Sequence, residues 1–144
     1  MLCSWGCPYS HSLDNNAVKW NGKVSAVVLI LYSINRFLWK PIAPDNFFGY
    51  LCRCHLNDYL GAIVFMAYTN ILISLFMDPK KQIVRLLPTL LMGVLCAFWW
   101  EWLAPKFLIY STADFWDAVA YLLGSATYWG IQKLQKILSS PSGT

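Results

Sequence analysis

The stretch EWLAPKFLIYSTADFWDAVAYLLG, residues 101–124, places three carboxylates in sequence that is otherwise almost entirely apolar and aromatic. The three acids are Glu101, Asp114 and Asp117. Ionisable groups at the edge of a membrane-spanning segment, or inside it, are costly, usually face the interior of a helix bundle and are functional candidates. We therefore take this stretch as the polar centre of the protein and interpret the rest of the chain around it.

The composition is typical of an integral membrane protein with a single domain. Of 144 residues, 58% are hydrophobic and only 12% are charged, whereas about a quarter of the residues of a soluble protein are charged. The formal net charge of +4 is modest, and the basic residues are scattered between apolar blocks. Such scattering indicates membrane topology rather than a basic patch, so we expect no nucleic-acid binding.

Apolar segments that approach the length needed to cross a bilayer as a helix, about 20 residues, recur four times. They cover residues 24–39, 59–77, 86–104 and 115–131, and an amphipathic continuation reaches residue 138. The polar residues 1–23 are predicted to form a tail that is not a cleaved signal peptide, and residues 139–144 a disordered tail. The predicted fold class is all-α, a bundle of four transmembrane helices in the lipid bilayer.

The distribution of basic residues predicts the orientation of this bundle. Four spans place both termini and the second loop on one side of the membrane. That side carries Lys19, Lys23, Lys80, Lys81, Arg85, Lys133 and Lys136, and the other carries Arg36, Lys40, Arg53 and Lys106. Because cytoplasmic loops carry the excess of Lys and Arg, we expect both termini to be cytoplasmic.

The same alternation brings the acidic residues to one membrane surface. The candidate ligand-binding residues are Arg36, Asp58, Glu101, Asp114 and Asp117. One interpretation is a site for a cation, a proton or the polar head of a lipid-linked substrate. The other is structural: Arg36 pairs with Glu101 or Asp117 to fix the helix register, while Asp58 and Asp114 stabilise helix N-termini. The residue types alone leave both open.

Helical spacing predicts that two of these acids face the bundle interior. Gly93 and Ala97 precede Glu101 at intervals of four residues, and Ala120 and Gly124 form a small-xxx-small pair on the helix of Asp117. Small residues on such a stripe let helices approach closely. We therefore expect helix packing along both stripes.

Other polar residues give weaker signals. We expect His55 to be a solvated loop histidine. The alternative is that it ligates a metal or relays protons. Asn70, in the middle of a span, is expected to hydrogen-bond to another helix. The chain has no Ser-His-Asp arrangement, glycine-rich phosphate loop or His-x-x-x-His pair. The sequence thus favours a binding protein over an enzyme, with no cofactor expected and the metal content open.

The acidic pattern resembles that of the VanZ-like family of small bacterial membrane proteins. The matching features are Glu101 at the end of the third span, the pair Asp114 and Asp117 after a short loop, Gly124 seven residues later, and Asp58 at the start of the second span. The chain departs from the family pattern at four positions. Family members carry Gln, Arg, Asn and His where this chain has Ala104, Ser111, Tyr121 and Ala62.

The resemblance implies a multi-pass protein of the bacterial cytoplasmic membrane that is connected with the cell envelope. In the family's named relative it implies low-level resistance to the glycopeptide antibiotic teicoplanin. It is compatible with an envelope lipid, a glycopeptide-related component or an ion as the ligand of the acidic residues.

Two further functions fit the sequence. One is a small proton- or cation-coupled transporter, which we expect to form a homo-oligomer because four short helices enclose little space. The other is a membrane thiol-disulfide oxidoreductase that uses Cys52 and Cys54, although a Cys-x-Cys pair without a second pair is a weak redox motif.

Overall fold

Helices account for all the regular structure that the computed structural model describes, in residues 15–77, 79–108 and 114–139. The α-helices are α1 Asn15–Ile34, α2 Phe47–Cys54, α3 Leu56–Phe76, α4 Leu86–Ala97 and α5 Phe115–Ser139. Two π-helical segments, η1 Asn35–Trp39 and η3 Phe98–Leu103, extend α1 and α4. Two short 3-10 turns are η2 Pro79–Lys81 and η4 Ala104–Lys106. The predicted all-α class is confirmed.

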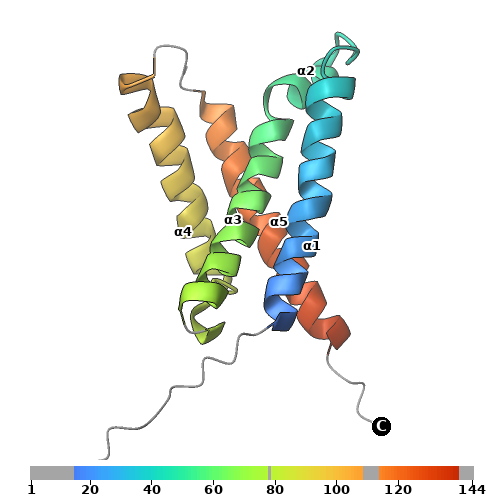
Figure 1. Cartoon of the computed structure of the whole chain (residues 1–144). Coiled ribbons are helices and arrows are strands. Elements are labelled where there is room, and N and C mark those ends of the chain that lie inside the picture. The colour runs from blue at the N-terminus through green and yellow to red at the C-terminus, as the bar shows by residue number, and fades with distance from the viewer. Residues whose placement is uncertain (1–14, 78, 109–113, 140–144) are drawn as a thin grey trace, which may run out of the picture.

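The four long helices alternate in direction along the chain (Figure 1). Helix α3 packs against α1 and α5, and α5 in turn packs against α4. The short helix α2, the end of α4 with η3, and the start of α5 lie together at one end, which we call the acidic end (Figure 1). The start of α1 and the end of α5 lie at the opposite end. This arrangement brings acids that are far apart in the sequence together at the acidic end.

Small residues allow the close contacts among α3, α4 and α5. Gly93 and Ala97 on α4 are buried, and a Cβ added at Gly93 would lie 2.6 Å from Oγ of Ser125 on α5. A Cβ at Gly124 would overlap the backbone carbonyl oxygen of Tyr59 on α3. Ala120, one turn before Gly124, is also buried. These glycines are therefore positions where two helix backbones meet.

The first helix starts earlier than the sequence predicted. Residues 1–23 were expected to form a polar tail, but α1 begins at Asn15. The physical reason lies at Asn21, whose side chain is 1% exposed and hydrogen-bonds to residues of α5. A polar residue is therefore part of the helix packing rather than of a solvated tail. The expectation for residues 1–14 and 140–144 lies outside the described residues.

Two other boundaries differ from the prediction. The loop after the first span contains the helix α2, which begins where the side chain of Asn46 accepts a hydrogen bond of 2.8 Å from the backbone N–H of Gly49. An N-cap of this kind satisfies an otherwise unpaired helix donor. The last helix continues past residue 131, where the predicted fourth span ends, and reaches Ser139. The sequence had indicated such an extension as an amphipathic segment that reaches residue 138.

A buried polar network joins three helices in the half of the bundle away from the acidic end. The hydroxyl of Tyr128 accepts a hydrogen bond of 2.6 Å from Asn70 and donates one of 2.7 Å to Asn21. Gln132 donates to the same Asn21 oxygen at 2.7 Å. Asn70 also hydrogen-bonds to both backbone groups of Ile83, which follows η2. The predicted hydrogen bond from Asn70 to another helix is confirmed.

In the ranges that the structure describes, two helical segments are long and apolar enough to cross a membrane. They are Leu56–Phe76, with a mean hydropathy of 1.8, and Leu86–Lys106, with 1.5. Of the 18 most apolar consecutive residues in each segment, only 39% and 17%, respectively, are buried inside the protein. Large apolar side chains are exposed on all four long helices, for example Ile30, Phe65, Leu95 and Leu123.

Candidate functional site

The centre of the acidic end is a contact between His55 and Asp117. His55 follows α2, and Asp117 lies in the first turn of α5. The Asp117 carboxylate accepts a hydrogen bond from Nδ1 of the imidazole at 2.6 Å. The two side chains are only 7% and 22% exposed. The expectation of a solvated loop histidine is therefore wrong, because α5 covers His55.

Glu101 and Asp114 lie next to this pair and are joined through the backbone. Oε2 of Glu101, on η3, accepts a hydrogen bond of 2.6 Å from the backbone N–H of Asp114. The Asp114 carboxylate in turn accepts from the backbone N–H of Trp116 at 2.9 Å and caps α5. Asp114 thus has the capping role that its position suggested, while Glu101 ties the end of α4 to the start of α5.

Asp58 completes the acidic cluster, which we define as His55, Asp58, Glu101, Asp114 and Asp117. It lies in the first turn of α3 and accepts a hydrogen bond of 3.0 Å from the hydroxyl of Tyr121 on α5. The carboxylates of Asp58, Glu101 and Asp117 are near enough to interact electrostatically with one another. The structure therefore brings together all four acids that the sequence singled out.

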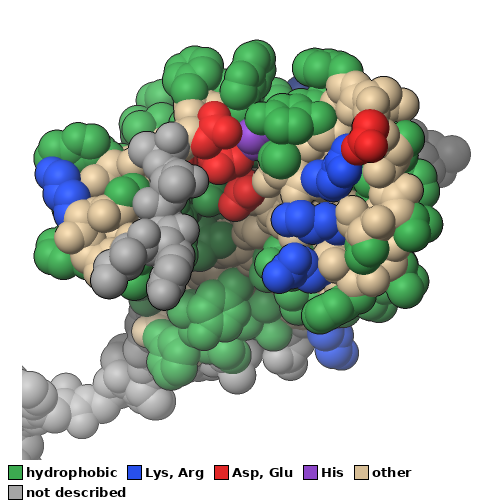
Figure 2. Space-filling model, turned by 90° about the horizontal axis from the view of Figure 1, so that it is seen from above, with side chains coloured by type: hydrophobic (Ala, Val, Ile, Leu, Met, Phe, Trp, Pro, Cys, Tyr) green, Lys and Arg blue, Asp and Glu red, His purple; other side chains and the backbone are tan. Residues whose placement is uncertain are grey.

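The acidic cluster has no Lys or Arg partner among the residues that the structure describes. The two ion pairs near this end are Arg53 with Asp45, at 2.5 Å, and His55 with Asp117. Arg36 is exposed at the end of α1 and pairs with neither Glu101 nor Asp117, so the structural pairing that the sequence allowed is not formed. Figure 2 shows a group of acidic side chains beside a histidine, with basic side chains on either side of this group and a further acidic side chain among those on the right.

A cavity of about 350 Å³ opens beside the acidic cluster. It lies among four helical segments, with Tyr32 on α1, Asp58 on α3, Cys96 on α4 and Tyr121 on α5 in its wall. Asn57 contributes a second polar side chain to the wall. One carboxylate of the cluster is therefore accessible from a space large enough for a small ligand group.

Two buried polar atoms at this end have no hydrogen-bond partner among the described residues. They are Nε2 of His55 and Oδ1 of Asn35. The amide of Asn35 uses its nitrogen instead, donating to Oδ1 of Asn57 at 2.8 Å and to the carbonyl oxygen of Cys52 at 3.1 Å. Buried polar groups without a partner are rare, because they forfeit hydration without compensation. Oδ1 of Asn35 can therefore accept a further bond, and Nε2 of His55 can accept one when the imidazole is neutral or donate one when it is protonated.

Three residues of the cluster have the chemistry and spacing of metal ligands. One potential ligand atom from each of His55, Asp114 and Asp117 lies within 4.8 Å of those of the other two. A neutral imidazole and two carboxylates suit Zn²⁺ or another divalent transition ion. A metal would compete with the contact between His55 and Asp117, so ion binding requires a rearrangement of that pair.

Sequence reasoning did not include Tyr121 in the site, and for His55 it preferred the solvated interpretation over metal ligation or proton relay. Tyr121 was named only as a departure from the family pattern, and its hydrogen bond to Asp58 depends on the crossing of α3 and α5. His55 lies 62 positions before its partner. The available signal was that His55 stands three residues before Asp58, close to a predicted helix start at the acidic end.

Cys52 and Cys54, the residues that a redox function would use, form no disulfide in the part of the chain that the structure describes. Cys52, Cys54 and Cys96 are all free thiols. Cys52 is buried and Cys54 is exposed, and residues two apart on a helix point in different directions. The arrangement within α2 gives no support to a Cys52–Cys54 disulfide.

Comparison of the chain with family models, with curated proteins and with solved structures finds no match.

Proposed function

We propose that this protein is a four-span integral membrane protein of the VanZ-like type that binds a positively charged ligand at the acidic cluster. The observation that carries the proposal is the gathering of four carboxylates around one histidine, without a Lys or Arg partner in the described residues. Close like charges are unfavourable unless a cation or protons compensate them. A bound cation would supply that compensation.

The membrane part of the proposal is supported by the exposed apolar surface. Two segments pass the length and hydropathy test, and most of each is not buried by the rest of the protein. A soluble protein rarely exposes large contiguous apolar areas. Helices α1, with 20 residues, and α5, with 25, also have enough length for a hydrocarbon core of about 30 Å.

The location of the cluster supports a binding role at one membrane surface. Helix reversal places the acids at a single end of the bundle, where α2 and the start of α5 lie (Figure 1). With the termini cytoplasmic, as the basic residues predict, this end faces outward. A cation at this position is reached from outside the cell without crossing the bilayer, which suits a protein that acts on the cell envelope.

The test measures how small cations, which carry no acyl chain, change the thermal unfolding of the full-length protein in detergent. We use Mg²⁺, Zn²⁺ and ethylammonium as probes, with Na⁺ at equal ionic strength as the reference. A cation at about 100 times its dissociation constant stabilises the folded state by about 2.7 kcal/mol. At least one probe should therefore raise the unfolding temperature by several degrees.

Two neutral variants and one control locate the effect. Glu101→Gln and Asp117→Asn should abolish the cation-dependent shift, because each removes a charge of the cluster. Asp45→Asn should retain it, because Asp45 is exposed and pairs with Arg53 away from the cluster. Absence of a shift for all three cations, or an equal shift in the neutral variants, would contradict the proposed function.

Cation-coupled transport, in a homo-oligomer, would use the same acidic cluster and so depends on the same result. It additionally requires uptake of the cation into sealed vesicles that contain the protein. Uptake that Glu101→Gln abolishes would favour transport, and stabilisation without uptake would favour binding alone.

A further inference from the structure

The cavity beside Asp58 borders two further hollows. A second hollow of about 350 Å³ shares Phe65, Cys96 and Trp100 with it, and a third of about 290 Å³ shares Tyr32, Gly61 and Phe65. Because they have wall residues in common, the three hollows adjoin one another. We call the three together the forked groove.

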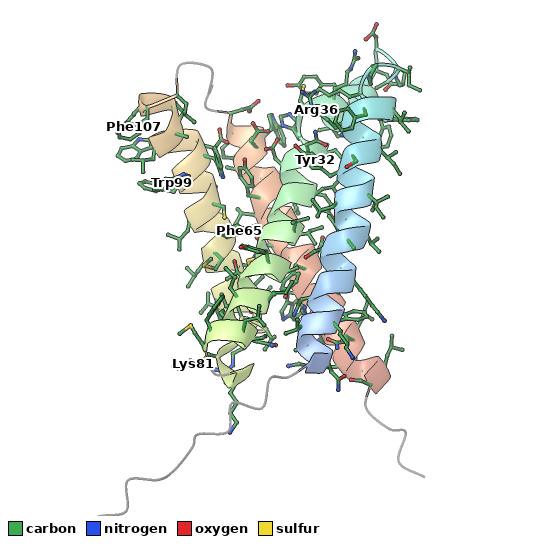
Figure 3. All side chains as sticks on the ribbon, in the orientation of Figure 1. Tyr32, Arg36, Phe65, Lys81, Trp99 and Phe107 are labelled. Carbon is green, nitrogen blue, oxygen red and sulfur yellow. The ribbon has the colours of Figure 1, made fainter. Side chains whose placement is uncertain are left out.

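The two branches of the forked groove run on either side of α3. One branch continues between α3 and α4 past Met92 and Leu95, and the other between α1 and α3 past Leu29 and Tyr68. Phe65 belongs to all three hollows and lies where they meet. Figure 3 shows Phe65 between the ribbons of α3 and α4, below Tyr32. From Asp58 to Tyr68 the groove follows α3 for about 15 Å.

The branches are apolar, whereas the junction with the acidic end is polar. Asp58, Asn57 and the hydroxyl of Tyr121 line the cavity beside the acidic cluster, and the branches are lined mainly by aliphatic and aromatic side chains. Gly61 faces two of the hollows, and a Cβ added there would have no heavy atom within 4 Å. The missing side chain at Gly61 therefore leaves room where the groove divides.

The polar head of the groove has a net negative charge. Tyr121 donates one hydrogen bond to Asp58, but a carboxylate can accept about four. The indole ring of Trp100 also lines this cavity, and aromatic faces attract ammonium groups. Arg36 follows Tyr32 by four residues, is exposed and makes no ion pair with a described acid, so it is available for a phosphate at the same end.

We propose that the forked groove binds one two-chain phospholipid whose headgroup ends in a primary ammonium, with the ammonium at Asp58 and one acyl chain in each branch. The proposal rests on the proposed function and names the ligand of the acidic cluster. Charge complementarity selects the headgroup, because an anionic head without an amine would meet Asp58 and Glu101 unfavourably. The two adjoining branches select a lipid with two chains.

The experiment measures lipid retained by the full-length protein in native mass spectrometry. Delipidated protein in detergent receives equal amounts of a phosphatidylethanolamine and a phosphatidylglycerol with identical chains. The first has the ammonium and the second does not. We expect the ethanolamine lipid to be retained roughly tenfold more strongly, the ratio that corresponds to about 1.4 kcal/mol for a charge-assisted hydrogen bond.

Two variants and two matched controls test the head and the groove separately. Asp58→Asn should remove the preference for the ethanolamine lipid but leave retention of both. Gly61→Leu should reduce retention of both lipids, since the new side chain occupies the point of division. Asp45→Asn and Gly130→Leu should behave as wild type, because Asp45 is exposed and pairs with Arg53, and Gly130 on α5 also has open space around its Cα.

The outcomes separate this inference from the proposed function. Equal retention of the two lipids, or a preference that survives Asp58→Asn, would overturn the headgroup assignment. Wild-type retention in Gly61→Leu would overturn the groove. If any of these results is found while Mg²⁺, Zn²⁺ or ethylammonium still stabilises the wild type, the lipid inference is wrong and the proposed function stands. If no cation stabilises the wild type and no lipid is preferred, both fall.

Discussion

His55 owes its burial to contacts that are remote in sequence. A lone histidine in a polar loop is usually solvated, and nothing in residues 40–57 predicts that α5 covers this one. Asp114 is the opposite case, because an acid just before an apolar helix is an N-cap by local rules. Acidic side chains and their approximate position could thus be predicted, but not the pairing of His55 with Asp117.

Replacement of His55 by leucine should destabilise the protein. The variant leaves the Asp117 carboxylate, which is 22% exposed, without its imidazole partner. Loss of a hydrogen bond to a charged group costs about 1.5–3 kcal/mol. We expect a lower midpoint of thermal or denaturant unfolding in detergent, followed by circular dichroism.

The matched control is the exposed ion pair at the same end. Arg53→Ala breaks the contact with Asp45, whose side chain is 94% exposed, and should cost at most about 1 kcal/mol. If His55→Leu lowers the free energy of unfolding by no more than Arg53→Ala does, the pairing of His55 with Asp117 does not stabilise the fold.

The stripes of small residues predicted which faces of α4 and α5 pack against other helices. They did not predict which helix packs against each face. The stripe of Gly124 meets α3, whereas that of Gly93 meets α5, and spacing within one helix cannot distinguish neighbours. The start of α1 was missed for a related reason. Asn21 has the polarity of a tail residue, and only Tyr128 and Gln132 on α5 make its burial favourable.

Gly124→Ala should destabilise the contact between α3 and α5. The new methyl group would overlap the carbonyl oxygen of Tyr59 and lie 2.8 Å from Cβ of Ala62. Overpacking of this kind typically costs about 1–3 kcal/mol. Gly130→Ala has open space and should instead be neutral or stabilise α5 by up to about 1 kcal/mol. Measured in parallel, the unfolding midpoint of Gly124→Ala should fall below that of the wild type and that of Gly130→Ala should not, and equal stability of the two variants would contradict the packing described.

Tyr128→Phe should weaken the connection among α1, α3 and α5. The hydroxyl has hydrogen bonds to Asn70, Asn21 and Gln132, and the side chain is 0% exposed. Removal leaves buried amide groups with fewer partners, at about 1–3 kcal/mol. Hydrogen exchange of the α1 amides should accelerate, because this network is the polar link between α1 and α5. Unchanged exchange would show that the Tyr128 hydroxyl is not needed to hold α1 in place.

The whole molecule depends on the reversal of direction from one long helix to the next. The apolar segments and the polar connections between them predict this alternation, and the alternation alone predicts that Asp58, Glu101, Asp114 and Asp117 meet. The forked groove was not predictable, because it depends on how far α1 and α4 diverge around α3 and on the missing side chain at Gly61. Both the proposed cation site and the proposed lipid site require all four long helices to cross the membrane.

Cysteine labelling in intact cells tests this requirement most directly. Single cysteines replace Asp45 and Lys106 near the acidic end, and Lys81 and Lys136 near the other, in a variant without native cysteines. A membrane-impermeant maleimide should label the positions of Asp45 and Lys106 from outside, and those of Lys81 and Lys136 only after the membrane is opened. Labelling of the Asp45 and Lys106 positions from opposite sides would contradict the account, because the acids could not then form one cluster at one membrane surface.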